Sequence, residues 1–292
     1  MDFSIVFSGG GIRGATHVGA LLALEENGLY PKMVGGTSAG SVVAGLYAYG
    51  YNAKELVDIV KDMCKHKRLF LDYDNKSLIK STFNLIFRKK VTYDCILKGN
   101  YLEKYINDIT KGKRITDCTK GILIPTLDII SQNTIVYTNC TERSYNDKNT
   151  CNYVYGNNEV LSKVIRSSCS FPGIFKPVKI NNMVLVDGGV TNNLPVNLML
   201  NSCGDNILAI DVSKKVEKID NPNVINTLYT SFGIMSTCLK KLTSVNETVL
   251  LYPTLPDDAN LLSFDKMEEC MEIGYNHTLN ELVRIKSVLN IK

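Results

Sequence analysis

Hydrophobic runs of strand length alternate with segments of helical periodicity along the 292-residue chain. The first strand is predicted at Phe3–Phe7 and the first helix at Ala15–Asn27, with Gly28 placed to end that helix. A second strand at Met33–Val34 is followed by a second helix at Ser41–Tyr49. Because strands and helices alternate in this way, we expect an α/β fold with a mostly parallel central sheet between layers of helices.

The alternation continues through the rest of the chain after a mainly helical stretch. Helices are predicted in that stretch at 51–64, 76–87 and 100–109. Further strands are predicted at 121–130, 134–137, 184–186, 207–212 and 248–252, and further elements are an Asn-rich loop at 139–152 and helices near 159–166, at 224–242 and from about 266 onward. No composition shift marks a linker, so we expect one domain over 1–292, with a motif-bearing core at about 3–212, a helical cap insertion at about 52–115 and a C-terminal extension at about 213–292.

Composition places the chain among ordinary globular proteins. Hydrophobic residues make up 45% and charged residues 21%, which excludes disordered, collagen-like and coiled-coil classes. The formal net charge of +4 is unevenly distributed, because residues 51–120 hold 16 Lys or Arg and 9 Asp or Glu. This basic stretch suits an anionic lipid surface, and it equally suits the solvated outer face of a helical cap.

Cysteine usage and hydropathy bear on the compartment. The nine cysteines are scattered and form no C-x-x-C pair, a pattern typical of buried thiols in a reducing compartment. No basic leader precedes the first strand, and the longest uncharged run, Met33–Ala53, contains five glycines and several polar residues. Such a run is a poor membrane span, so we expect a cytoplasmic protein, with peripheral membrane contact left open.

A sharp strand-to-helix turn is predicted around Ser38. The pentapeptide Gly36-Thr37-Ser38-Ala39-Gly40 fits G-x-S-x-G, in which small residues on both sides of the serine allow close backbone packing. The serine side chain then projects from a strained turn at a helix N-terminus, whose N–H groups stabilise a developing negative charge. Ser38 is therefore a candidate nucleophile, although five small residues also suit a plain tight turn.

A second glycine-rich turn, Ser8-Gly9-Gly10-Gly11-Ile12-Arg13-Gly14, opens the first helix. Consecutive glycines are able to direct backbone N–H groups toward one point, as an oxyanion hole requires. The same turn also fits G-x-G-x-x-G, the dinucleotide fingerprint. That fingerprint needs an acidic residue at the end of the second strand, where this chain has Gly35-Gly36-Thr37. The pattern therefore favours acyl transfer over nucleotide binding.

An aspartate turn and the scarcity of histidine define the candidate base. Asp187-Gly188-Gly189 follows a hydrophobic strand, which places the carboxylate at the carboxyl edge of the sheet, although Asp-Gly is also a common turn pair. None of the three histidines occupies the late turn in which a hydrolase triad has its histidine: His17, His66 and His277. The remaining candidate is Asp187 acting directly on Ser38, which requires a buried carboxyl group with a raised pKa.

Taken together, G-G-G-x-R-G in the first turn, G-T-S-A-G in the second and D-G-G at 187–189 resemble the patatin-like phospholipase family. The block from Ser167 to Pro177 also resembles the Ser- and Pro-containing segment that precedes the family's aspartate. The resemblance covers about residues 3–212 and implies a three-layer α/β/α fold, with Ser38 as nucleophile and Asp187 as proton acceptor. It maps the oxyanion loop onto Gly9, Gly10, Gly11 and Arg13, the nucleophile elbow onto Gly36 and Gly40, and the aspartate motif onto Gly188 and Gly189.

The same resemblance implies an activity. It implies hydrolysis of acyl esters in phospholipids or other lipids through a Ser-Asp dyad and an acyl-enzyme intermediate, with no metal or other cofactor and no nucleic-acid partner. The C-terminal third and the basic cap lie outside the motifs, so no head-group preference is implied. Two further hypotheses stay open: a thioesterase or transacylase that shares the acyl-enzyme, and a non-catalytic lipid-binding module.

Overall fold

The computed structural model describes residues 2–75, 95–140, 152–202, 206–213, 224–244 and 246–290. Its strands are β1 (Ser4–Phe7), β2 (Met33–Gly36), β3 (Gly121–Asp128), β4 (Thr134–Thr138), β5 (Tyr153–Gly156), β6 (Val178–Ile180), β7 (Met183–Asp187), β8 (Ile207–Ile210) and β9 (Val249–Leu251). Its α-helices are α1 (Ala15–Glu26), α2 (Ala39–Tyr49), α3 (Ala53–Lys65), α4 (Lys67–Phe70), α6 (Asn100–Ile109), α7 (Leu161–Ser168), α8 (Val196–Ser202), α9 (Val224–Thr243), α10 (Met267–Asn280) and α11 (Leu282–Val288). Short 3₁₀ turns are η1 (Gly11–Gly14), η2 (Ile115–Asp117), η3 (Gly188–Val190) and η4 (Phe264–Lys266).

The strands form one sheet with a parallel centre. Its order is β5-β4-β3-β2-β1-β8-β9, and β1 pairs in parallel with both β2 and β8. Phe7 lies opposite Gly36 in this register, so the turns that follow β1 and β2 are neighbours at the carboxyl edge of the sheet. The predicted mostly parallel sheet is therefore confirmed.

The strand that carries Asp187 reaches this edge from the opposite direction. β7 runs antiparallel to the end of β3, with Leu185 opposite Asp128 and Asp187 opposite Thr126. Since β2 pairs with β3 only as far as Leu123, this end of β3 extends beyond β2. β7 therefore returns along the extension and delivers Asp187 to the same edge as the turn after β2.

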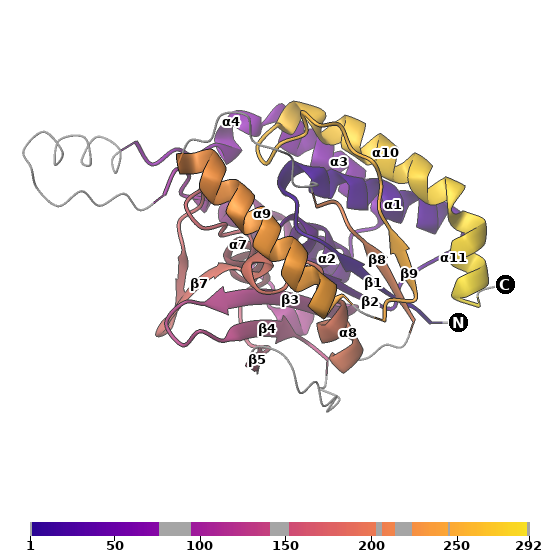
Figure 1. Cartoon of the computed structure of the whole chain (residues 1–292), viewed down its shortest axis with the longest axis horizontal. Helices are drawn as coiled ribbons and strands as arrows, with labels where there is room; N and C mark the ends of the chain where they lie inside the picture. The colour runs from indigo at the N-terminus through magenta and orange to yellow at the C-terminus, as the bar shows by residue number, and fades with distance from the viewer. Residues whose placement is uncertain are drawn as a thin grey trace, which may run out of the picture.

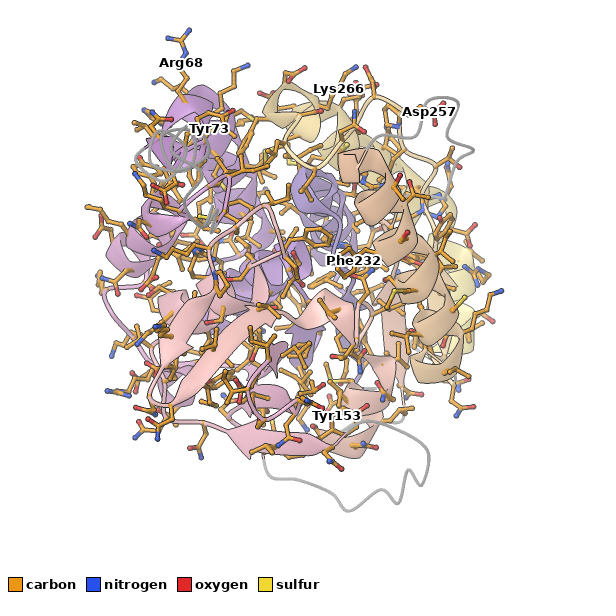
Figure 2. All side chains as sticks on the ribbon, turned by 60° about the vertical axis from the view of Figure 1, so that its left-hand side comes forward. Arg68, Tyr73, Tyr153, Phe232, Asp257 and Lys266 are labelled. Atoms are coloured by element: carbon orange, nitrogen blue, oxygen red, sulfur yellow. The ribbon has the colours of Figure 1, made fainter. Side chains whose placement is uncertain are left out.

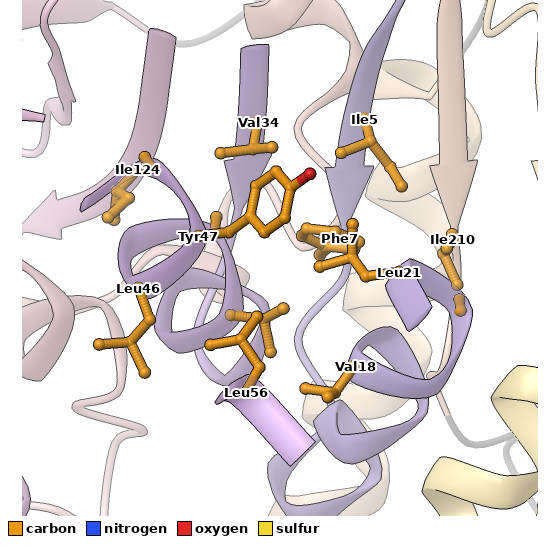
Figure 3. Packing of buried hydrophobic residues seen from close by; sticks show 14 of the residues in the cluster. Ile5, Phe7, Val18, Leu21, Val34, Leu46, Tyr47, Leu56, Ile124 and Ile210 are labelled. Atoms are coloured by element: carbon orange, nitrogen blue, oxygen red, sulfur yellow. The ribbon is translucent and has the colours of Figure 1, made fainter. Parts of the chain in front are cut away.

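Alternating side chains of the strands build a core on each face of the sheet. Ile5 and Phe7 of β1 pack into the larger core with α1, α2 and α3, whereas Val6 packs into a smaller core with α8. Figure 3 shows the larger core, where Val18, Leu21, Leu46 and Leu56 come from the helices and Ile5, Phe7, Val34, Ile124 and Ile210 from the strands. Figure 1 shows helices on both faces of the sheet, so the architecture has the three expected layers.

Helix α10 closes the larger core from the outside. It lies along α1 in Figure 1, and the two backbones approach closely at Gly19 and Gly274. A Cβ atom at Gly19 would lie 1.8 Å from the Met271 carbonyl oxygen, and one at Gly274 would lie 2.1 Å from the Thr16 carbonyl oxygen. Helix α10 is thus packed directly on the helix that follows the first glycine-rich turn.

Most predicted elements are confirmed with boundary shifts of a few residues. The pattern does not predict β5, β6 or α8, which contain four, three and seven residues and carry too little periodicity to be recognised. The helix predicted at 76–87 and most of the loop predicted at 139–152 lie outside the described residues. Among the residues that are described, no helix has the length and apolar character needed to span a bilayer.

Candidate active site

Ser38 occupies a strained turn between β2 and α2. It is not a glycine, yet its φ is 53° and its ψ is −123°, and it forms the N-cap of α2. The flanking glycines are required by packing, because a Cβ atom at Gly36 would lie 2.2 Å from the Gly40 carbonyl oxygen and one at Gly40 would lie 2.5 Å from the Phe7 carbonyl oxygen. This is the geometry of a nucleophile elbow, in which close packing holds one side chain outward in a strained conformation.

Hydrogen bonds from distant segments hold the elbow in place. The Ser38 backbone N–H donates to Ser168 Oγ at 3.0 Å, and that hydroxyl donates to the Pro125 carbonyl oxygen at 2.8 Å. The Thr37 hydroxyl donates to the Asn192 carbonyl oxygen at 2.8 Å. The turn is therefore fixed by α7, β3 and the segment after η3 as well as by its own strand and helix.

Asp187 is a buried carboxyl group in contact with Ser38. Its side chain hydrogen-bonds with the Ser38 side chain and accepts the Gly189 N–H at 2.7 Å, and the residue is 1% exposed. Burial raises the pKa of Asp187 to about 7, while these two hydrogen bonds act in the opposite direction. Such a carboxyl group is able to take up and release a proton near neutral pH.

The aspartate turn is packed as tightly as the elbow. A Cβ atom at Gly188 would lie 2.2 Å from the Pro125 carbonyl oxygen. The Asp187 N–H donates to the Ser170 carbonyl oxygen at 3.0 Å, which joins β7 to the end of α7. Pro125 thus lies next to Gly188 and also accepts the hydroxyl of Ser168, so one stretch of β3 aligns the two turns.

Cys169 lies beside the pair. Its thiol is 3.9 Å from the Ser41 hydroxyl. Burial raises the pKa of this thiol to about 12, so it is neutral at physiological pH. The charge of Asp187 also raises the pKa of the thiol, and a hydrogen bond with the Ser38 side chain lowers it. The thiolate form in which a cysteine acts as a nucleophile is therefore suppressed at this position.

The first glycine-rich turn lies against the elbow. A Cβ atom at Gly9 would be 3.2 Å from Ser38 Cβ, and the Gly9 N–H donates to the Asn193 carbonyl oxygen at 3.1 Å. By contrast, the N–H groups of Gly10 and Gly11 have no hydrogen-bond partner among the described residues. Two unoccupied backbone donors in the turn beside Ser38 are suited to stabilise a negative oxygen.

Arg13 and His17 hold the first glycine-rich turn through hydrogen bonds to its carbonyl oxygens. Arg13 is 5% exposed, and its Nε donates to the Gly10 carbonyl oxygen at 3.3 Å. Because a trans peptide directs its C=O and N–H oppositely, this bond turns the Gly11 N–H away from Arg13. Burial lowers the pKa of His17 to about 4, so its ring is neutral and the Nε2 atom donates to the Ser8 carbonyl oxygen at 2.9 Å.

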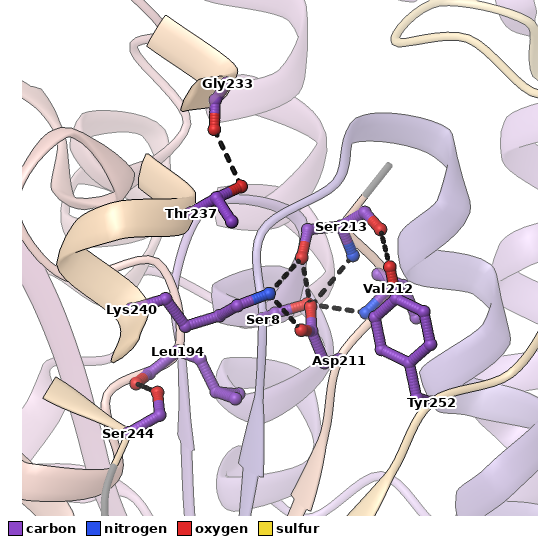
Figure 4. Close-up of polar contacts among 10 residues, drawn as sticks. All are labelled: Ser8, Leu194, Asp211, Val212, Ser213, Gly233, Thr237, Lys240, Ser244 and Tyr252. Atoms are coloured by element: carbon purple, nitrogen blue, oxygen red, sulfur yellow. Dashed lines mark hydrogen bonds and ion pairs between the residues drawn. The ribbon is translucent and has the colours of Figure 1, made fainter. Parts of the chain in front are cut away.

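A polar network ties the same turn to β8 and α9. The Ser8 hydroxyl accepts the Val212 N–H at 2.8 Å. Figure 4 shows the adjoining contacts, in which Lys240 of α9 pairs with Asp211 and donates to Ser213 Oγ at 2.9 Å. The side chain of Asp211 is only 3% exposed, so this ion pair anchors α9 at the carboxyl edge of the sheet.

An apolar cavity opens beside Ser38. It has about 940 Å³ of empty space including its mouth, and Gly11, Ser38 and Cys169 line it where the two turns meet. The remaining lining is apolar and comes from several helices, including Val18, Val42, Leu46, Leu56, Val60 and Phe70. Its apolar lining is typical of a site that takes an extended hydrophobic group.

The structure brings together most of the residues singled out from the sequence. Ser38, Asp187 and the Gly9–Gly11 stretch lie around one point, and Gly36, Gly40, Gly188 and Gly189 shape the turns that hold them. His66 pairs instead with Asp62 at 3.0 Å, and His277 lies on α10. Sequence reasoning missed the positioning contacts of Ser168, Asn192 and Asn193. Among the described residues, no group of three His, Cys, Asp or Glu side chains is arranged to hold a metal ion.

The chain belongs to the patatin-like phospholipase family, whose family model matches residues 5–200. A similar protein is the uncharacterized protein YqhO of Bacillus subtilis, 29% identical over 246 residues that cover 80% of this chain and 79% of that protein. Lysophospholipase NTE1 of Candida albicans is 29% identical over 208 residues, which cover 71% of this chain but only 13% of that much longer protein.

Solved structures with a similar arrangement share little sequence with this chain. VipD from Legionella pneumophila matches with a TM-score of 0.48 and 13% identity, over 97% of this chain and 67% of VipD. Human GIVD cytosolic phospholipase A2 matches with a TM-score of 0.48 and 12% identity, over 99% of this chain and 58% of that protein.

Proposed function

We propose that the protein is a lipid acyl hydrolase that cleaves carboxylic ester bonds of glycerophospholipids or related lipids. The observation that carries the proposal is the contact between a strained serine and a buried carboxyl group at the wall of an apolar cavity. In a family of phospholipases, this arrangement supports Ser38 as the nucleophile and Asp187 as the proton acceptor.

The proposed reaction has two halves. Ser38 Oγ attacks the ester carbonyl carbon while its proton passes to the ionised Asp187, and the carbonyl oxygen becomes negative. The Gly10 and Gly11 amides stabilise this oxygen, a role we assign to them rather than to Gly9 because the Gly9 N–H is occupied. The C–O bond to the alcohol then breaks, and Asp187 returns the proton to the leaving oxygen.

The second half releases the fatty acid. Water attacks the Ser38 acyl ester and gives its proton to Asp187, and the same two amides stabilise the new tetrahedral oxygen. When the bond to Ser38 breaks, the proton returns to Ser38 Oγ. The positive end of the α2 dipole lies at Ser38 in both halves and favours negative charge there.

The cavity supports a single-chain lipid as the first substrate class to test. Its wall beside Ser38 is formed by Gly11, Ala39 and Cys169, and beyond them it is apolar, which suits an acyl chain whose ester carbon lies at Ser38 Oγ. One relative that aligns over 71% of this chain is named a lysophospholipase. We therefore propose lysophospholipids as substrates, with diacyl phospholipids as the comparison.

Free thiols support the proposed compartment. The described cysteines include Cys95, Cys118, Cys169 and Cys270, which are buried and form no disulfide. Thiols in this state persist in a reducing environment, so we propose a cytoplasmic protein that meets its lipid substrate at a membrane surface.

The direct test is product analysis. The purified protein is incubated with lysophosphatidylcholine or phosphatidylcholine, and released fatty acid is measured by mass spectrometry. Ser38→Ala should lower turnover at least about 10⁴-fold, because the nucleophile is lost while the fold is kept. Ser287→Ala, an exposed serine on α11, is the matched control and should behave like the wild type. A Ser38→Ala variant with wild-type turnover would exclude the assignment.

A further inference from the structure

A basic and apolar surface surrounds α4. We name the exposed side chains Lys65, Lys67, Arg68, Leu69 and Tyr73 the α4 rim. Leu69 is 48% exposed and Tyr73 is 47% exposed, which is high for large apolar side chains. Figure 2 shows Arg68 projecting outward from the body of the protein, with Tyr73 below it.

The rim is joined directly to the wall of the apolar cavity. Phe70 follows Leu69 in α4, is 4% exposed and lines the cavity. Its ring packs edge-on against Tyr101 at 4.9 Å between centroids and lies 5.9 Å from the ring of Phe264. A molecule that contacts the outer side of α4 is therefore separated from the cavity by the thickness of one short helix.

The cations of the rim make no direct ion pairs with the described carboxylates. Lys65, Lys67 and Arg68 form no ion pair with any described residue. Among the acidic side chains nearby, Asp62 pairs with His66 and accepts the Tyr105 hydroxyl. Asp265 and Glu268 are exposed and lie with Lys67 around Cys64, so they offset part of the positive charge on that side of the rim. Asp72 accepts the backbone N–H groups of Gly99 and Tyr101. The surface therefore carries positive charge beside exposed apolar groups.

We propose that the α4 rim docks the protein on the surface of an anionic lipid bilayer. Lys65, Lys67 and Arg68 contact lipid phosphates and carboxylates, while Leu69 and Tyr73 enter the interfacial layer. Docking in this orientation places the helix that carries the cavity wall at Phe70 next to the membrane, so a lipid that leaves the bilayer is close to the cavity. This inference rests on the proposed function, because it assigns the rim to delivery of a membrane lipid to Ser38.

Charge is tested with a matched pair of variants in the Ser38→Ala background, which prevents hydrolysis of the vesicles. Lys67→Gln with Arg68→Gln should weaken binding to phosphatidylcholine vesicles containing phosphatidylserine about 30-fold, since each cation near an anionic surface contributes about fivefold. Lys111→Gln with Lys113→Gln removes the same charge from the exposed turn that follows α6, and should change binding less than about threefold through loss of net charge alone.

The apolar part of the rim is tested in the same assay. Leu69→Ser should weaken vesicle binding about fivefold or more, because an exposed leucine would no longer enter the interface. Val283→Ser is the control, since Val283 is 83% exposed on α11. Pure phosphatidylcholine vesicles and added salt should each weaken wild-type binding and remove most of the difference between the charge variants.

Hydrolysis of a short soluble ester separates this proposal from the proposed function. With Ser38 restored, the rim variants should hydrolyse the soluble ester at the wild-type rate, because none of the substituted side chains lines the cavity. If the wild type hydrolyses no ester but vesicle binding follows the rim, docking stands and the proposed function fails.

Two results would overturn the docking proposal. One is equal vesicle binding by the wild type, the rim variants and the controls. The other is loss of binding in Ile234→Ser with Met235→Ser but not in the rim variants, which would assign docking to the exposed face of α9, where these two residues are 49% and 54% exposed.

Discussion

The two glycine-rich turns of this protein begin as near copies and end with different chemistry. Each follows a parallel strand, the strands are paired with Phe7 opposite Gly36, and each turn leads into a helix on the same face of the sheet. In the first turn the left-handed residue is Gly11, with φ 61°. In the second turn it is Ser38, with φ 53°.

The residue in that conformation decides what each turn presents. A glycine has no side chain, so the turn after β1 presents backbone N–H groups. The serine after β2 presents its hydroxyl group instead, with about 1–3 kcal/mol of backbone strain that close packing by Gly36 and Gly40 must offset. Adjacent strands thus bring two backbone N–H donors and the Ser38 hydroxyl group to one point.

Among variants that keep Ser38, the largest effect should come from the aspartate turn at 187–189, whose carboxyl group contacts Ser38 in the second turn but no donor of the first. Asp187→Asn removes the proposed proton acceptor of Ser38, and turnover should fall about 10³–10⁴-fold. Steady-state kinetics with the soluble ester measures this loss. An unchanged rate would mean that Ser38 is activated by another group.

The same variant should be more stable than the wild type at alkaline pH. The pKa of Asp187 is about 7 in the folded protein, compared with about 3.9 in an unfolded chain, so folding favours the protonated form. Wild-type stability is therefore lost as pH rises from about 4 through 7, and at pH 8 the asparagine variant should gain up to about 4 kcal/mol. The difference should vanish near pH 4, as measured by urea unfolding.

The next largest effect is expected from a substitution in the turn after β1. A Cβ atom at Gly11 would lie 2.6 Å from the Leu261 carbonyl oxygen, so Gly11→Ala must shift the turn and its amide. We expect turnover to fall about 10²–10³-fold. Gly28→Ala is the control, because Gly28 has a φ of 76° and a Cβ atom added there would meet no other atom within 4 Å, so this variant carries the same backbone strain without the contact. Equal losses of turnover in the two variants would mean that backbone strain, and not a displaced Gly11 N–H group, causes the loss.

The pH dependence of the rate should distinguish the role of Asp187 from that of the backbone donors. Asp187 accepts a proton only when ionised, so kcat/KM should fall about tenfold per pH unit below pH 7 and level off above it. The backbone donors do not titrate, so Gly11→Ala should keep the same profile at a lower rate. A profile centred near pH 4 in the wild type would contradict the role of a buried carboxyl group.

The smallest effect concerns the support of the elbow. Ser168→Ala removes the oxygen that accepts the Ser38 N–H, and kcat should fall about tenfold with little change in KM. Ser162→Ala removes a serine that is 2% exposed on the same helix and hydrogen-bonds to Asn107, so it controls for loss of a buried hydroxyl. Equal kcat in the two variants would assign Ser168 to stability alone.

Local features of the site are predictable from sequence because they are encoded locally. The elbow follows from small residues around Ser38, and the donor turn from three consecutive glycines. The direction of β7 is not predictable in this way, since a short hydrophobic run reads the same in parallel and antiparallel pairs. The bonds from Ser38 to Ser168 and from Thr37 to Asn192 join residues 130 and 155 positions apart, and no local pattern reports such contacts.

The cavity is also not predictable from the sequence. Its walls combine α1, α2, α3, α4 and α6 with the segment around Phe264, and each helix by itself shows only an apolar face suited to a core. Only the packing of these faces against one another leaves the space beside Ser38.

Covalent labelling is the most direct test of Ser38 as the nucleophile and Asp187 as its proton acceptor. The wild type, Ser38→Ala and Asp187→Asn are treated with an alkyl fluorophosphonate, and the modified peptide is identified by mass spectrometry. We expect one adduct on Ser38, formed faster at pH 8 than at pH 5 and much more slowly in Asp187→Asn. An adduct elsewhere, or labelling of Ser38 at the same rate in Asp187→Asn, would contradict these roles.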